Sequence, residues 1–148
     1  MTLPQPHEVR AAITMKLLAV PELIGMLAPN APWNQPDGKP NRINSIVPMD
    51  AIDRITPMYV GIMAGPVVKN ERVSFNSFIY MRVYNTIDRD YISIERACAI
   101  IAGTLDRTGL TMDNTVAAQI DLEQILGEAT DEALNQKYRE LQFRLVLL

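Results

Sequence analysis

Residues 73–84, VSFNSFIYMRVY, alternate with a period of two, and this alternation constrains the fold more than any other feature of the chain. Successive side chains of a β-strand point to opposite faces, so one face of this strand carries Val73, Phe75, Ile79, Met81 and Val83. The other face carries Phe78, Tyr80 and Tyr84 beside Ser74, Asn76 and Arg82. The aromatic residues indicate that this second face is also covered, so we expect a fold built around a sheet.

Three further segments predict strands of the same sheet. Residues 58–64 alternate in the same way and end at Gly65-Pro66, which predicts a hairpin with residues 73–84. The closing run is apolar at alternate positions: Leu141, Phe143, Leu145 and Leu147. Residues 115–127 contain many helix formers, yet Ile120 and Leu122 alternate with Asp121 and Glu123. We interpret them as a strand followed by a charged turn over residues 128–135, with a helix as the alternative.

Helical spacing predicts two helices. The first carries Val9, Ile13, Leu17 and Val20 on one face, and Pro21 breaks or kinks it before a short turn over residues 22–27. The second has an apolar stripe made of Ile94, Ala97, Cys98, Ile101 and Leu105. We expect Ser93 to be its N-cap and Gly109 its C-cap.

These elements predict one α+β domain over residues 1–148. The expected architecture is a mainly antiparallel four-stranded sheet packed with two helices, in the order α-β-β-α-β-β. If both helices cover the same face, the face with Phe78, Tyr80 and Tyr84 is exposed in a monomer, and a large exposed apolar patch generally marks a partner site.

A long loop over residues 28–48 follows the first helix. Five prolines and several asparagines interrupt it, and loops beyond about 12–15 residues are usually functional, disordered or ordered only by a partner. It holds Trp33, the only tryptophan. Its indole either anchors in a partner's pocket or packs against its own domain.

Charge and composition exclude several functional classes. The chain has 148 residues, 14 Lys and Arg against 17 Asp and Glu, and a net charge of −3, which argues against a protein that grips phosphate backbones. Its single cysteine fits a reducing compartment, and no apolar run approaches the roughly 18 residues of a membrane span. The acidity lies in the C-terminal third and includes Asp121, Glu123, Glu128, Asp131 and Glu132. These residues form either a solubilising surface or an acidic face that repels DNA or meets a basic partner.

No catalytic, cofactor-binding or metal-binding motif emerges from the sequence. His7 has no neighbouring ligand, and Cys98 lies within an apolar stripe, where a buried and unreactive thiol is expected. We therefore expect no cofactor, no metal and no enzymatic activity.

The order of elements resembles the tail terminator, or tail completion, proteins of long-tailed bacteriophages. The resemblance is carried by FIYMRVYNT, by YISIERACAIIAGTLDRTG after it, and by the closing QKYRELQFRLVLL, and it spans most of the chain. The segment 28–48 and the acidic run near Asp131 depart from the family pattern.

The resemblance implies a virion protein that assembles in the host cytoplasm. Such proteins form a ring, usually hexameric, on the head-proximal end of the tail tube, where they stop tube polymerisation and meet the head-tail connector proteins. DNA only passes through the lumen. Candidate contact residues are Trp33, Phe78, Tyr80 and Tyr84, and the acidic residues of the C-terminal third are candidates for the lumen or surface. The alternatives are a head-completion or connector (neck) protein and, from another class, a small-molecule-binding α+β domain or enzyme.

Overall fold

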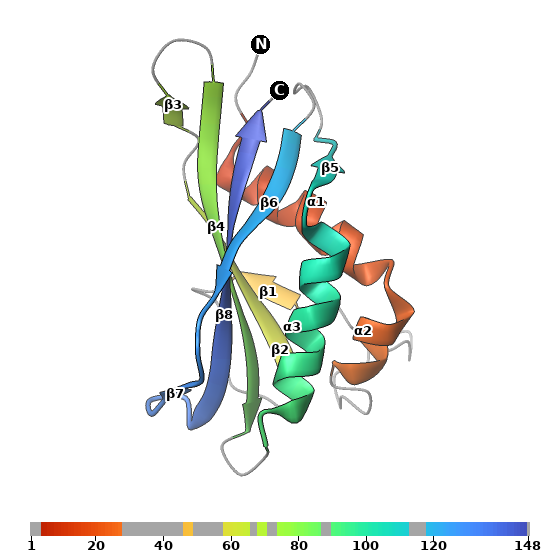
Figure 1. The fold of residues 1–148 in the computed structure, drawn as a ribbon, viewed down its shortest axis with the longest axis vertical. Coiled ribbons are helices and arrows are strands. Elements are labelled where there is room, and N and C mark those ends of the chain that lie inside the picture. The colour runs from red at the N-terminus through yellow and green to blue at the C-terminus, as the bar shows by residue number, and fades with distance from the viewer. Residues whose placement is uncertain are drawn as a thin grey trace, which may run out of the picture.

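The computed structural model describes residues 4–27, 46–48, 58–65, 68–70, 74–86, 90–112 and 118–147 (Figure 1). Three helices lie in this part of the chain: α1 (Pro6–Leu18), α2 (Pro21–Met26) and α3 (Ile92–Leu105). The strands are β1 (Ile46–Pro48), β2 (Met58–Ala64), β3 (Val68–Asn70), β4 (Ser74–Thr86), β5 (Thr108–Leu110), β6 (Ala118–Ile125), β7 (Ala129–Asp131) and β8 (Gln136–Leu147). The α+β class is as predicted.

The strands form one sheet in the order β1-β2-β4-β8-β6-β5, with β3 paired to β4 and β7 paired to β8. The prediction of four strands is wrong in number. Its four strands are the central ones, β2, β4, β8 and β6, and the structure adds four strands of three residues each. Such short strands show too little alternation to be found in a sequence. One of them, β1, pairs in parallel with β2 and occupies the last three residues of the predicted loop; residues 28–45 lie outside the described part.

Strands β4 and β8 form the longest strand pairing in the sheet. They pair antiparallel over twelve positions, from Phe75 opposite Leu147 to Thr86 opposite Gln136. On the other side of β8, strand β6 has a bulge between Leu122 and Gln124. The bulge adds one residue to β6, so Glu123 and Gln124 both lie on the face away from the core.

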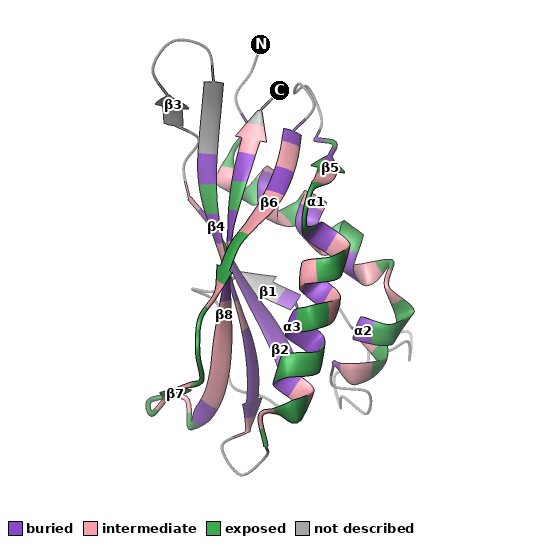
Figure 2. Cartoon of the chain, in the orientation of Figure 1, coloured by how far each residue is buried: buried purple, intermediate pink, exposed green. Residues whose placement is uncertain are grey.

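All three helices lie on one side of the sheet: α1 and α3 pack on the strands, and α2 packs against α1 and α3 (Figure 1). Helix α1 buries Val9, Ile13 and Leu17 as its spacing predicted. A new helix begins at Pro21 because proline is favourable in a first turn but cannot continue the preceding helix. The inward residues of the central strands complete the core, among them Val60, Ile62, Ile79, Met81, Val83, Leu141, Phe143 and Leu145 (Figure 2).

The ends of α3 differ from the prediction. Ser93 does not cap the helix; Tyr91 is the N-cap residue, and Asp90 accepts a hydrogen bond from the Ile92 amide at 3.0 Å. The C-cap is Asp106, not Gly109, which lies in β5. The left-handed conformation that we expected of a glycine belongs to Arg107, with φ of 57°.

Candidate assembly surface

The face of the central strands that the three helices leave free is the candidate site, and we call it the outer face. It carries the alternate residues Tyr59, Met63, Phe78, Tyr80, Arg82, Tyr84, Tyr138, Glu140, Gln142 and Arg144. The period of two in β4 predicted this placement of its aromatic side chains. The outer face has two parts with different exposure.

Three tyrosines from neighbouring strands occupy one end of the outer face. The rings of Tyr59 and Tyr84 stack with 4.9 Å between centroids and 9° between planes, and the Tyr138 ring lies 5.3 Å from that of Tyr84. Tyr59 and Tyr84 are buried. Burial raises the pKa of Tyr84, against an opposing effect of the hydrogen bond from Arg82. This end of the face is therefore a packed, rigid layer.

An ion pair crosses the middle of the outer face. Arg82 donates from Nε to Oε1 of Glu140 at 2.9 Å, and its guanidinium lies over the Tyr138 ring, 4.5 Å from the centroid. Burial alone lowers the pKa of Arg82, but hydrogen bonds to Tyr84 and Glu140 outweigh it, so the pKa is raised. Arg82 remains charged and fixes β4 to β8 from the outside.

The other end of the outer face exposes apolar side chains. Phe78 and Met63 are each 46% exposed. Tyr80 is half-buried; it lies directly opposite Met63 and two residues from Phe78 along β4. The Arg144 guanidinium lies 5.8 Å from the centre of the Phe78 ring, and its Nε is 3.0 Å from Oε1 of Glu123. We call Met63, Phe78, Asp121, Glu123 and Arg144 the Phe78 corner.

The predicted contact residues therefore have different positions. Phe78 is exposed and Tyr80 is half-buried, so both can reach a partner. Tyr84 is 1% exposed, which corrects the expectation that it offers a free surface: its neighbours Tyr59 and Tyr138 cover its ring. Trp33 lies outside the described residues. Sequence reasoning missed Met63, although its outward position in the alternation of β2 could have identified it.

The acidic residues do not form one patch. Asp121 and Glu123 lie on the outer side of β6 beside Arg144, whereas Asp131 ends β7 opposite Gln136. Eight residues of β8 separate these two levels, about 27 Å at the rise of a strand. Glu128 and Glu132 are exposed at the second level, next to β7. A role in a lumen stays a prediction.

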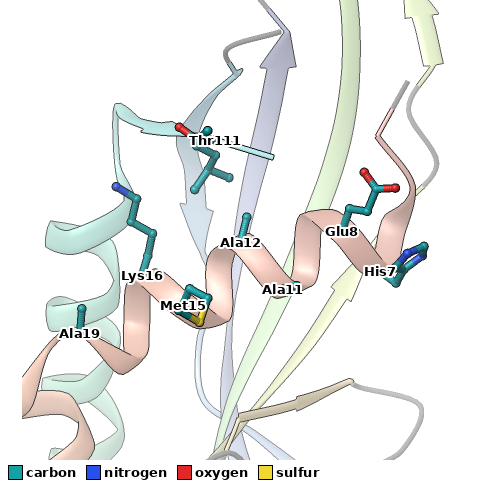
Figure 3. A pocket seen from close by; sticks show the side chains of 9 residues that line it. His7, Glu8, Ala11, Ala12, Met15, Lys16, Ala19 and Thr111 are labelled. Atoms are coloured by element: carbon teal, nitrogen blue, oxygen red, sulfur yellow. The ribbon is translucent and has the colours of Figure 1, made fainter. Parts of the chain in front are cut away.

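A hollow of about 530 Å³ lies on the opposite side of the molecule, along α1 (Figure 3). The exposed side of the helix and the segment after β5 form its walls, and we call it the α1 hollow. Met15 is 68% exposed there, beside the methyl groups of three alanines. The polar lining residues are His7, Glu8, Lys16 and Thr111. His7, Glu8 and Lys16 are spread along α1, and Thr111 lies on the facing segment, so the four side chains do not converge on one point (Figure 3).

The described residues contain no group of three or more His, Cys, Asp or Glu that could hold a metal. Cys98 is buried, and burial raises the pKa of its thiol to about 11. This agrees with the expectation of an unreactive thiol. None of the described helices is long and apolar enough to span a membrane.

Comparison with known proteins gives structural matches alone. No protein-family model matches the chain, and no curated protein matches it in sequence. A chain from the virion of a native gene transfer agent particle has a similar fold, with a TM-score of 0.67 and 13% identity, over 95% of this chain and 95% of that one. A second solved chain, whose name does not state a function, has a TM-score of 0.60 and 12% identity, over 96% of this chain and 94% of its own. At these identities the matches establish the fold.

Proposed function

We propose that the chain is a virion structural protein that forms a ring on the head-proximal end of a phage tail tube. In this role it stops tube polymerisation and joins the tail to the head connector, and no bond is made or broken. The observation that carries the proposal is the fold shared over 95% of both chains with a protein of a gene transfer agent virion. The resemblance of the sequence to tail terminator proteins points to the same end of the tail.

Two features of the surface support assembly. A closed ring of identical subunits needs two different surfaces on each subunit that fit each other. The chain has an exposed apolar corner on the outer face and an apolar hollow on the helix side. Both are available on one molecule at the same time.

The charge suits passage of DNA through such a ring. The chain carries a net charge of −3, and Glu128 and Glu132 project from the end of the sheet near β7. An acidic wall repels phosphates and lets DNA slide. Tight binding of the purified ring to duplex DNA at physiological salt would contradict this part of the proposal.

Native mass spectrometry and negative-stain imaging of the purified protein, alone and with cognate tail tubes, test the proposal. We expect closed rings, free or at one end of each tube, and tubes that no longer elongate when tube protein is added. A protein that ignores tube ends but binds DNA-filled heads would be a neck protein instead. A protein that forms no ring and binds neither structure would overturn a virion role.

A further inference from the structure

The Phe78 corner and the α1 hollow lie on opposite sides of the same end of the sheet. We propose that the Phe78 corner of one copy occupies the α1 hollow of the next copy, and that this contact closes the ring. The inference rests on the proposed function, because it names the partner as a second copy of this chain.

The strand register places the two surfaces at similar heights. Phe78 of β4 lies opposite Arg144 of β8. Leu110 of β5 lines the α1 hollow; it lies opposite Ala118 of β6, which in turn lies opposite Leu147 of β8. Three residues of β8 separate these levels, about 10 Å at the rise of a strand. The contact joins two different surfaces, so it is head-to-tail. Such a head-to-tail contact closes into a ring when its rotation allows.

The two surfaces are chemically suited to each other. The corner presents an aromatic ring and a methionine, each 46% exposed. The hollow presents alanine methyl groups and the Met15 side chain, and its volume of about 530 Å³ has room for both. A methionine packs well against an aromatic ring, so Met15 is a suitable neighbour for Phe78.

Both surfaces carry charged side chains that can pair across the contact. The corner has two carboxylates, Asp121 and Glu123, against one cation, Arg144, so its net charge is −1. The α1 hollow is lined by one cation, Lys16, and one carboxylate, Glu8, so these two charges cancel. Lys16 is exposed at the α1 hollow and can pair with the carboxylates of β6. Such a pair would hold the two surfaces in one register, and the net charge of −1 on the corner disfavours contacts between two identical corners.

Cross-linking tests the contact directly. The variant Met63→Cys with Ala11→Cys places one thiol in each surface and keeps Phe78, while the native Cys98 is buried. A short bis-maleimide linker should give a ladder of covalent oligomers that ends at the ring size on a denaturing gel. Each single variant should give no ladder, because the contact is head-to-tail. The matched control Ile92→Cys with Ala11→Cys uses a residue 70% exposed on α3 and should also give none.

Assembly of serine variants provides the second measurement. Phe78→Ser and Met15→Ser should each raise the concentration needed for half assembly by about tenfold or more, whereas Ile92→Ser should leave it unchanged. Circular dichroism confirms that each variant is folded. Rings that form without a cross-linked ladder, and that survive both substitutions, would overturn this contact while the proposed function stands. Failure of the native protein to form rings, free or on tubes, would overturn both.

Discussion

Arg82 and Glu140 join the two central strands through an ion pair on the outer face, with 2.9 Å between Nε and Oε1. Their side chains are 30% and 12% exposed, so solvent screens the pair only in part. Glu140 also accepts a hydrogen bond from Gln142 at 2.8 Å. The pair therefore fixes β4 and β8 to each other on the outer face.

Removal of this carboxylate should destabilise the protein. Glu140→Ala leaves a partly buried guanidinium without its acceptor, and we expect a loss of about 1–3 kcal/mol in the free energy of unfolding, measured by urea denaturation. The matched control is Glu123→Ala, which breaks an ion pair whose side chains are 40% and 46% exposed. Its loss should stay below about 1 kcal/mol. Equal losses in the two variants would contradict the role given to Glu140.

The buried thiol predicts a dependence of stability on alkaline pH. Burial raises the pKa of Cys98 from 9.0 to about 11. Between these values the unfolded chain releases a proton that the folded chain keeps, so the free energy of unfolding falls as pH rises, by about 2–3 kcal/mol in total. Urea denaturation at pH 8 to 11 under reducing conditions should show a shallower fall for Cys98→Ala. Parallel curves for the two proteins would refute this assignment.

The start of α3 offers a test of which residue satisfies its free amides. Asp90→Ala removes the acceptor of the Ile92 amide, and we expect a loss of about 0.5–1.5 kcal/mol in thermal or urea unfolding. Ser93→Ala should change stability by much less, because Ser93 lies inside the helix and does not cap it. The reverse order of the two effects would restore Ser93 as the cap.

One aspartate side chain bonds a backbone amide at the edge of β6. Asp106 Oδ1 accepts a hydrogen bond from the Leu122 amide at 2.8 Å, which satisfies a donor beyond the end of β5. In Asp106→Ala the Leu122 amide should exchange its hydrogen faster, as followed by nuclear magnetic resonance. Asp106→Asn keeps an oxygen acceptor and should retain most of the protection. Unchanged exchange in the alanine variant would rule out this contact in solution.

Periodicity predicted the parts of the fold that depend on long alternating or helical patterns. The inward faces of β4 and β8 and the stripe of α3 followed from it, because burial of one face is a property of the segment itself. The burial of Tyr84 could not be predicted in this way, because it depends on Tyr59 and Tyr138, which strand pairing brings beside it. The insertion of β8 between β4 and β6 is likewise set by tertiary packing.

The candidate site shows the same division. The outward position of Phe78 could be read from the chain, but the pairing of Arg82 with Glu140 requires the register of two strands that are distant in sequence. The residues that bond the free amides at the start of α3 could not be predicted either. Asp90 and Ser93 are both suitable acceptors, and only backbone geometry distinguishes them.

The central position of β8 has a consequence for how fast the protein folds. Fifty residues separate Thr86 from Gln136, the pair at which β4 and β8 come closest in sequence. Contacts of such long range require costly loop closure, so folding is expected to be slow, as in other proteins dominated by non-local pairing. The corner and the hollow are both complete only after this step. In the proposed ring, a subunit would be ready to assemble only once this pairing has formed.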